Sequence, residues 1–142
     1  MVQISLDKNN VLEIISNELS LIKSIRLVYV YGSFILRNDF HDIDVAVLFN
    51  SNVMGEDLFY KKAMELGRLL EKKFNYKFEF DVRPLNNSSI EFQYEVIKNG
   101  KLIYAESDDL RQEYEFNILS EYLEYSEMYK MFDQALLKRA IH

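Results

Sequence analysis

The chain has 142 residues, of which 49% are hydrophobic, and its formal net charge is −6. This length suits one domain with a substantial core, and high apolar content with modest charge excludes an intrinsically disordered chain. The absence of cysteine excludes disulfides, thiolate metal sites and a cysteine nucleophile. The acidic balance argues against direct binding of nucleic acid through bulk electrostatics.

No apolar run approaches the roughly 18 residues that would suggest a membrane span. Residues 1–20 alternate polar and apolar positions and contain no apolar run typical of a signal peptide. We therefore expect a cytoplasmic protein that does not contact a membrane.

Hydrophobic periodicity and turn residues predict the order of the elements. Apolar residues at helical spacing predict helices, and alternating or β-rich runs predict strands. In chain order the sequence predicts a helix at 8–23, strands at 25–31 and 42–49, a helix at 56–74, a strand at 77–83, a short helix and a strand at 102–105. For the short helix, Ser88 and Glu91 match a capping box, and Asn99-Gly100 marks its end.

From Ser107 the pattern is helical almost to the end, roughly 33 residues and near 50 Å if unbroken. A domain of this length is only about 35 Å across, so we expect this helix to kink, break or run past the body. We divide the chain into a core, 1–106, and a helical extension of the same domain, 107–142. The element order predicts an α+β fold with a mixed sheet of about four strands flanked by helices.

The second half of the long helix has apolar residues on more than one face, which favours a protein partner or self-association. Glu121, Glu124 and Glu127 would complement a basic partner surface.

Three acidic residues form a candidate metal site. Asp42 and Asp44 stand two apart in a predicted strand, so their side chains share a face roughly 6.5–7 Å apart. Such a pair can bind divalent cations. If strand 77–83 neighbours strand 42–49, Asp81 completes the cluster. The alternatives are a solvated turn for the Asp-x-Asp pair and an ordinary acid on an open strand face for Asp81.

Upstream, a strand runs into Gly32-Ser33. Glycine lets a ligand approach the backbone closely, and a helix opening at Ser33 would present N–H groups to an anion. The alternative is a plain strand-to-helix turn with Ser33 as N-cap. A phosphate site followed by a metal site suits metal-dependent phosphoryl or nucleotidyl transfer.

These motifs resemble the signature of the minimal nucleotidyltransferases of the polymerase-beta superfamily. The resemblance rests on Val30-Tyr31-Gly32-Ser33-Phe34, Asp42-Ile43-Asp44-Val45 and Glu79-Phe80-Asp81-Val82. Gly100 to Tyr104 and Glu113 to Tyr125 resemble the MntA antitoxin group, the nucleotidyltransferase partners of HEPN toxins. The resemblance implies a polymerase-beta-like fold and transfer of AMP from ATP to a tyrosine of a HEPN ribonuclease toxin.

The resemblance also implies residue roles. Asp42 and Asp44 would hold two Mg²⁺ ions, and Asp81 would ligate the second ion and take up the acceptor's proton. Gly32 and Ser33 would hold the β- and γ-phosphates of ATP.

The loop between the two motifs departs from the family. Phe34 to His41 makes eight residues, fewer than usual, and Arg37-Asn38 stands where an Arg-Gly is common. Arg37 is a candidate triphosphate contact, with an exposed surface arginine as the alternative. His41 replaces the usual serine before Asp-x-Asp. It adjoins the acidic pair and is either a phosphate contact or a surface histidine.

Two other functions stay open from the sequence. One is nucleotidyl transfer to a small molecule such as an aminoglycoside. Such enzymes usually have an added helical domain for the acceptor, and 142 residues leave no room for one unless another subunit supplies it. The other is a non-catalytic antitoxin that acts by occlusion within a complex. Label transfer from ATP to a co-expressed partner distinguishes these functions.

Overall fold

The computed structural model describes residues 7–40 and 42–141. The elements are α1 (Lys8–Ser20), β1 (Ile25–Tyr31), α2 (Ser33–Leu36), β2 (Asp42–Phe49), the 3₁₀ turn η1 (Glu56–Leu58), α3 (Phe59–Lys73), β3 (Glu79–Pro84), α4 (Ile90–Asn99), β4 (Lys101–Ala105) and α5 (Asp108–Ile141). This order confirms the predicted α+β class and adds the short helix α2. The predicted strands 25–31 and 42–49 have the observed bounds.

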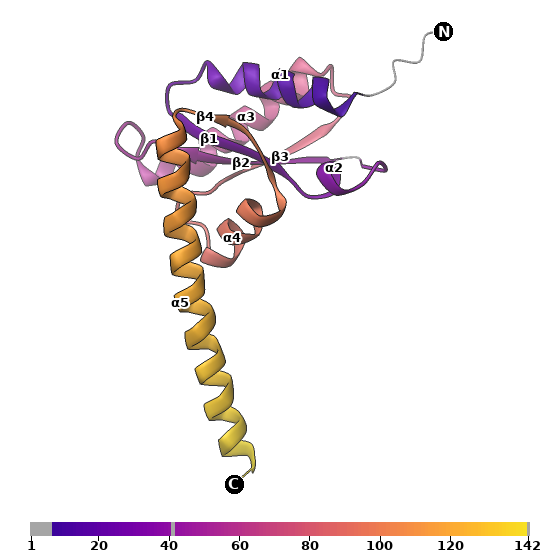
Figure 1. Ribbon diagram of the computed structural model, residues 1–142. Helices are drawn as coiled ribbons and strands as arrows, with labels where there is room; N and C mark the ends of the chain where they lie inside the picture. The colour runs from indigo at the N-terminus through magenta and orange to yellow at the C-terminus, as the bar shows by residue number, and fades with distance from the viewer. Residues whose placement is uncertain (1–6, 41, 142) are drawn as a thin grey trace.

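The four strands form one mixed sheet in the order β3-β2-β1-β4 (Figure 1). Strand β1 is antiparallel to both β2 and β4, whereas β2 and β3 are parallel. A parallel pair needs a crossover connection, which η1 and α3 supply. The condition that strands 42–49 and 77–83 are neighbours is therefore met.

Helices α1 and α3 cover one face of the sheet and form the larger core with it (Figure 1). On β2, the alternate residues Ile43, Val45 and Val47 point into this core and are fully buried. The helices contribute buried side chains at helical spacing, namely Val11, Leu12, Ile15 and Leu19 from α1, and Phe59, Ala63, Leu66 and Leu70 from α3. The alternation on β2 leaves its other residues on the opposite face.

That opposite face is only partly covered. A smaller core of Leu27, Tyr29, Ala46, Leu85 and Val96 lies between the sheet, α4 and the start of α5. Asp42 and Asp44 share the face of Ala46 because they precede it by even numbers of residues. Asp42 is exposed and Asp44 is half-buried, so the uncovered end of this face is acidic.

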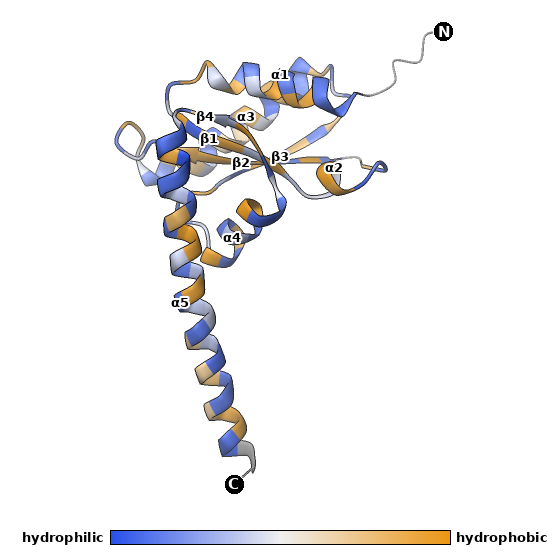
Figure 2. Cartoon of the chain, viewed as in Figure 1, coloured by the Kyte–Doolittle hydropathy of each residue, from blue (hydrophilic) through white to orange (hydrophobic). Residues whose placement is uncertain are grey.

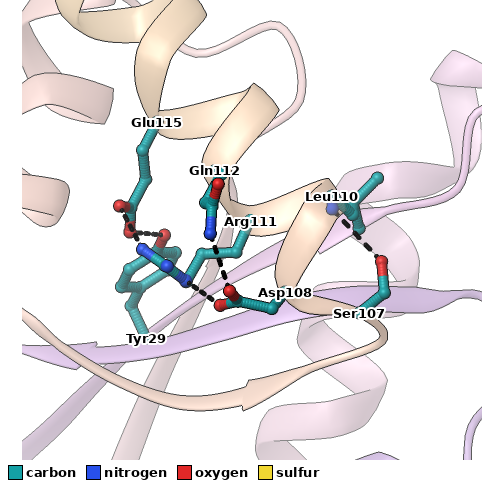
Figure 3. A network of polar contacts seen from close by, with 7 residues as sticks. All are labelled: Tyr29, Ser107, Asp108, Leu110, Arg111, Gln112 and Glu115. Atoms are coloured by element: carbon teal, nitrogen blue, oxygen red, sulfur yellow. Dashed lines mark hydrogen bonds and ion pairs between the residues drawn. The ribbon is translucent and has the colours of Figure 1, made fainter.

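A polar network holds the first turns of α5 against the sheet (Figure 3). The Tyr29 hydroxyl of β1 donates a hydrogen bond of 2.8 Å to Glu115. Arg111 pairs with Glu115 at 2.9 Å and with Asp108 at 2.8 Å. Burial and the Glu115 hydrogen bond raise the pKa of the Tyr29 phenol well above its usual value. The Tyr29–Glu115 hydrogen bond joins this network, and with it the start of α5, to the sheet.

The N-cap of α4 is Ser89, so the prediction that Ser88 caps this helix is wrong by one residue. The Ser89 hydroxyl accepts a 3.1 Å hydrogen bond from the Phe92 N–H. The Ser88 hydroxyl donates instead to the Pro84 carbonyl at 2.6 Å. Each serine therefore satisfies a different backbone group at the turn.

Helix α5 neither kinks nor breaks; it runs past the body, one of the three predicted outcomes (Figure 1). Its start packs on the sheet, and Ile118 is 6% exposed. Orange segments continue along the projecting half of α5 (Figure 2). The large apolar side chains exposed beyond Tyr122 include Leu123, Met128, Tyr129, Met131, Phe132, Leu136 and Leu137. The projecting half thus has apolar side chains without a cover from its own chain.

Within residues 7–40 and 42–141, no helix is both long enough and apolar enough to cross a bilayer.

Candidate active site

The register of the parallel pair β2–β3 places the three predicted carboxylates on one face. Asp44 is the Cα partner of Asp81, and Asp42 is the partner of Glu79. Neighbouring strands lie about 4.8 Å apart, and partners in register project to the same side. The structure therefore brings Asp42, Asp44 and Asp81 together at the uncovered end of the sheet and adds Glu79 to them.

The carboxylates of Asp44 and Asp81 repel each other. Partial burial and then the nearby Asp81 raise the pKa of Asp44, an effect that Arg83 opposes and Asp42 reinforces. Within residues 7–40 and 42–141, no three acidic, histidine or cysteine side chains are close enough to form a preassembled cation site. The backbone thus sets the three acids on one face, but their carboxylates are spread apart.

Arg83 occupies part of this acidic face. Its Nε and Nη2 each lie 3.2 Å from Oδ2 of Asp81. The sequence analysis did not single out this residue. The signal was available, because Arg83 stands two positions after Asp81 in the same strand and must share its face.

Gly32 is required by the contact between β1 and β2. Its φ of +79° is a conformation that residues with a side chain rarely adopt. A Cβ at this position would collide with the carboxylate of Asp44. The Gly-Ser and Asp-x-Asp motifs therefore touch each other, which brings a candidate phosphate site next to the acids.

Ser33 opens α2, as the sequence predicts. The N-cap of this helix is Gly32, whose carbonyl accepts hydrogen bonds from Ile35 at 3.1 Å and Leu36 at 3.2 Å. The alternative in which Ser33 is the N-cap is wrong, because Ser33 is the first helical residue and no side chain caps the helix.

The loop after α2 is held by Lys8 from the start of α1. The Lys8 ammonium donates to the carbonyl of Phe34 at 2.7 Å and also to that of Arg37. It lies over the rings of Phe34 and Phe40, 5.3 and 5.4 Å from their centroids. Sequence analysis missed Lys8, because no local pattern reveals contacts across 26 and 29 residues. The side chain of Arg37 is exposed, and His41 lies outside the described residues.

Three open hollows border Asp81, and two of them are larger than the third. One, of about 370 Å³, is lined by the acidic residues Asp42, Glu79 and Asp81. The other, of about 510 Å³, lies between α3 and the start of α4 and has Tyr60, Met64, Arg83 and Phe92 among its lining residues. Asp81 borders both, so a bound molecule can reach its carboxylate from either side.

The donor set fits a hard divalent cation. Carboxylate oxygens are the ligands that Mg²⁺ prefers, and it commonly takes one or two of them together with substrate phosphates and water. The raised pKa of Asp44 is the result of crowding and burial that a cation would relieve. The open hollows leave room for the phosphates.

The fold resembles those of solved toxin–antitoxin complexes. A chain of a toxin–antitoxin complex with AMP-PNP is 22% identical, with a TM-score of 0.66 over 92% of this chain and 99% of that one. A chain of a complex of the tri-AMPylated Shewanella oneidensis HEPN toxin with its MNT antitoxin is 20% identical, with a TM-score of 0.63 over 88% of this chain and 98% of that one. A chain of an MntA–HepT complex is 21% identical, with a TM-score of 0.64 over 92% and 99%.

Comparison with curated proteins gives no match. The family model described as polymerase beta, nucleotidyltransferase matches residues 12–109, which include both motifs and the strand of Asp81. The chain therefore belongs to the polymerase beta nucleotidyltransferase family.

Proposed function

We propose that this chain is a magnesium-dependent nucleotidyltransferase that transfers AMP from ATP to a tyrosine of a HEPN ribonuclease toxin and thereby neutralises it. The observation that carries the proposal is the register of Asp44 with Asp81, beside a glycine whose missing side chain leaves space for Asp44. Family membership supports the reaction class. The similar structures with AMP-PNP and with an AMPylated toxin support ATP as donor and a protein as acceptor.

Each site residue has a role in the proposed reaction. Asp42 and Asp44 would hold two Mg²⁺ ions, with Asp81 as a further ligand of the second. Bound magnesium would lower the pKa of the acceptor hydroxyl and offset charge on the phosphates. The N–H groups at Gly32 and Ser33 would bind the β- and γ-phosphates, and the exposed Arg37 is in the adjoining loop.

The proposed transfer needs no reactant other than ATP and the tyrosine. The tyrosine oxygen bonds to the α-phosphorus, and the bond from that phosphorus to the bridging oxygen of the β-phosphate breaks. Pyrophosphate leaves, and the phenolic proton passes to Asp81. The product tyrosine carries a bulky anion, which near an RNA-binding site would exclude the RNA phosphates by charge and size.

The projecting half of α5 supports a protein partner for the same reaction. Its exposed apolar side chains, such as Met131 at 67% and Phe132 at 63%, have no cover from the body. Glu121, Glu124 and Glu127 are exposed between them. An isolated helix of this kind gains stability when a partner buries its apolar residues. We propose that a HEPN toxin with a basic surface provides that cover and thereby presents its tyrosine to the site.

The test is label transfer in the presence of the co-expressed toxin and Mg²⁺. ATP labelled on the α-phosphate is expected to label the toxin, whereas ATP labelled on the γ-phosphate is not. Asp44→Asn keeps the shape of the side chain and removes its charge, so labelling should disappear while the circular dichroism spectrum persists. A tight, unlabelled complex would indicate an antitoxin that acts by occlusion. Label on an aminoglycoside would indicate a small-molecule acceptor.

A further inference from the structure

The ion pair between Arg83 and Asp81 places a positive charge where the proposed function needs a metal. We propose that Arg83 is a resident counter-ion of the acidic site: its guanidinium holds Oδ2 of Asp81 while no metal is bound, and a metal competes with it for that carboxylate. The inference rests on the proposed function, because it gives Asp81 to the same metal site.

The geometry of the pair supports this role. Nε of Arg83 donates a hydrogen bond of 3.2 Å to Oδ2 of Asp81, and Nη2 lies 3.2 Å from the same oxygen. The charge-assisted hydrogen bond and the ion pair engage Oδ2, an oxygen that a cation bound by both carboxylate oxygens would also use. Asp81 is the Cα partner of Asp44, so the guanidinium also offsets the repulsion between these two acids. The pair therefore stabilises the metal-free face and competes with the metal.

The guanidinium that pairs with Asp81 already lies near an aromatic ring. The guanidinium carbon of Arg83 lies 5.9 Å from the ring centroid of Phe92. The Phe92 ring in turn meets the edge of Tyr31, with centroids 5.6 Å apart at 80°. Arginine stacks favourably on aromatic faces, and the side chain of Arg83 is 57% exposed. This exposure and the hollow beside Phe92 leave the side chain room to rotate away from Asp81.

The exposure of the pair also makes the inference testable without loss of the fold. Exposed ion pairs contribute little to stability, so replacement of Arg83 should leave the structure intact. Its effect should appear in the affinity for a divalent cation. A guanidinium and a dication a few ångströms apart repel each other enough to weaken metal binding by about tenfold.

The experiment measures Mn²⁺ binding to the full chain by electron paramagnetic resonance of the free ion, with AMP-PNP present. Arg83→Gln is expected to bind Mn²⁺ about tenfold more tightly than the unaltered chain. Arg83→Lys keeps the positive charge but lacks the planar guanidinium, and its Mn²⁺ affinity should be closer to that of the unaltered chain. Lys138→Gln changes the net charge equally at the far end of α5 and should have no effect. In an Asp81→Asn background, the gain from Arg83→Gln should shrink.

The outcomes separate this inference from the proposed function. Equal or weaker Mn²⁺ binding by Arg83→Gln, with the unaltered chain binding normally, overturns the role of Arg83 and leaves the proposed function standing. Binding that strengthens in Lys138→Gln as much as in Arg83→Gln overturns it too, because the effect is then one of net charge. If neither the unaltered chain nor any variant binds Mn²⁺, the metal site fails and the inference fails with it.

Discussion

Asp44 of β2 and Asp81 of β3 are Cα partners in a parallel pair of strands, although a crossover through α3 separates them in the sequence. The same register places Glu79 opposite Asp42. The face therefore carries a fourth acid, which the proposed reaction does not use.

The pair of acids on β3 provides the first prediction. Asp81→Asn should reduce nucleotidyl transfer by at least a hundredfold, because general-base residues contribute about that much or more. Glu79→Gln removes the same charge from the same strand face and should leave activity within a fewfold. The measurement is the initial rate of label transfer to the toxin. Equal losses in the two variants would show that overall charge, and not the position of Asp81, matters.

Asp44→Asn should raise the stability of the fold while it abolishes activity. Burial and Asp81 raise the folded-state pKa of Asp44 above its unfolded value near 3.8. The folded chain therefore binds this proton more tightly, and its stability falls as pH rises from about 4 through the raised pKa. At pH 7 the asparagine variant should unfold at higher urea than the unaltered chain, and the difference should narrow toward pH 4. A variant that is less stable at pH 7 would contradict the electrostatic account.

Gly32→Ala should destabilise the fold by about 1–3 kcal/mol from the backbone conformation alone. The added Cβ would also displace the carboxylate of Asp44, so Mn²⁺ affinity should fall as well. Gly55→Ala is the matched control, because its φ of −71° suits alanine and its Cβ would meet only the flexible side chain of Asp57. Urea unfolding and Mn²⁺ titration of both variants check the prediction.

Lys8→Met should loosen the loop after α2. The variant loses the ammonium that binds the carbonyls of Phe34 and Arg37, at a cost of about 1–2 kcal/mol. Amide hydrogen exchange over residues 33–40 should accelerate more than exchange in the core of β1. Lys23→Met, at an exposed position between α1 and β1, is the control. Unchanged exchange in Lys8→Met would show that the loop does not depend on this contact.

Tyr29→Phe tests the network that anchors α5. Loss of the hydroxyl bond to Glu115 should cost about 1 kcal/mol at neutral pH. Because the folded-state pKa of Tyr29 is raised, the unfolded chain loses this proton first above pH 10. Stability then falls with rising pH by up to about 1.4 kcal/mol per unit for each such tyrosine.

The phenylalanine variant should show a shallower loss of stability between pH 10 and 11 than the unaltered chain. Tyr76→Phe, at a position that is 73% exposed, should leave this slope unchanged. Urea unfolding at several pH values provides the measurement.

Local patterns predicted most of the fold. The strands at 25–31 and 42–49 and the alternation that places Asp42 with Asp44 follow from neighbouring residues, as does the length of α5. The sequence did not predict that β2 pairs with β3, and the role of Asp81 was stated on the condition that they do. Strand order depends on how α3 crosses the sheet. Contacts such as Lys8 to Phe34 and Tyr29 to Glu115 join distant segments. No local periodicity encodes them.

The same locality explains two further differences between sequence and structure, at the cap of α4 and at Arg83. Ser88 and Ser89 both fit a capping position by type, and only the folded turn decides between them. The alternation of side chains along β3 predicts that Arg83 shares a face with Asp81. Whether the two residues form an ion pair depends on the charge and exposure of that face in the folded protein.

Successive residues of β3 alternate between the core and the acidic face, so the position of Asp81 depends on the register of this strand. A shift of this strand by one residue would turn Asp81 toward the hydrophobic interior and expose Phe80 and Val82 to water. Such a slip costs too much apolar burial to persist. The burial of Phe80 and Val82 therefore also orients the carboxylate of Asp81 away from the core. A sheet with β3 in the wrong register would be both unstable and inactive.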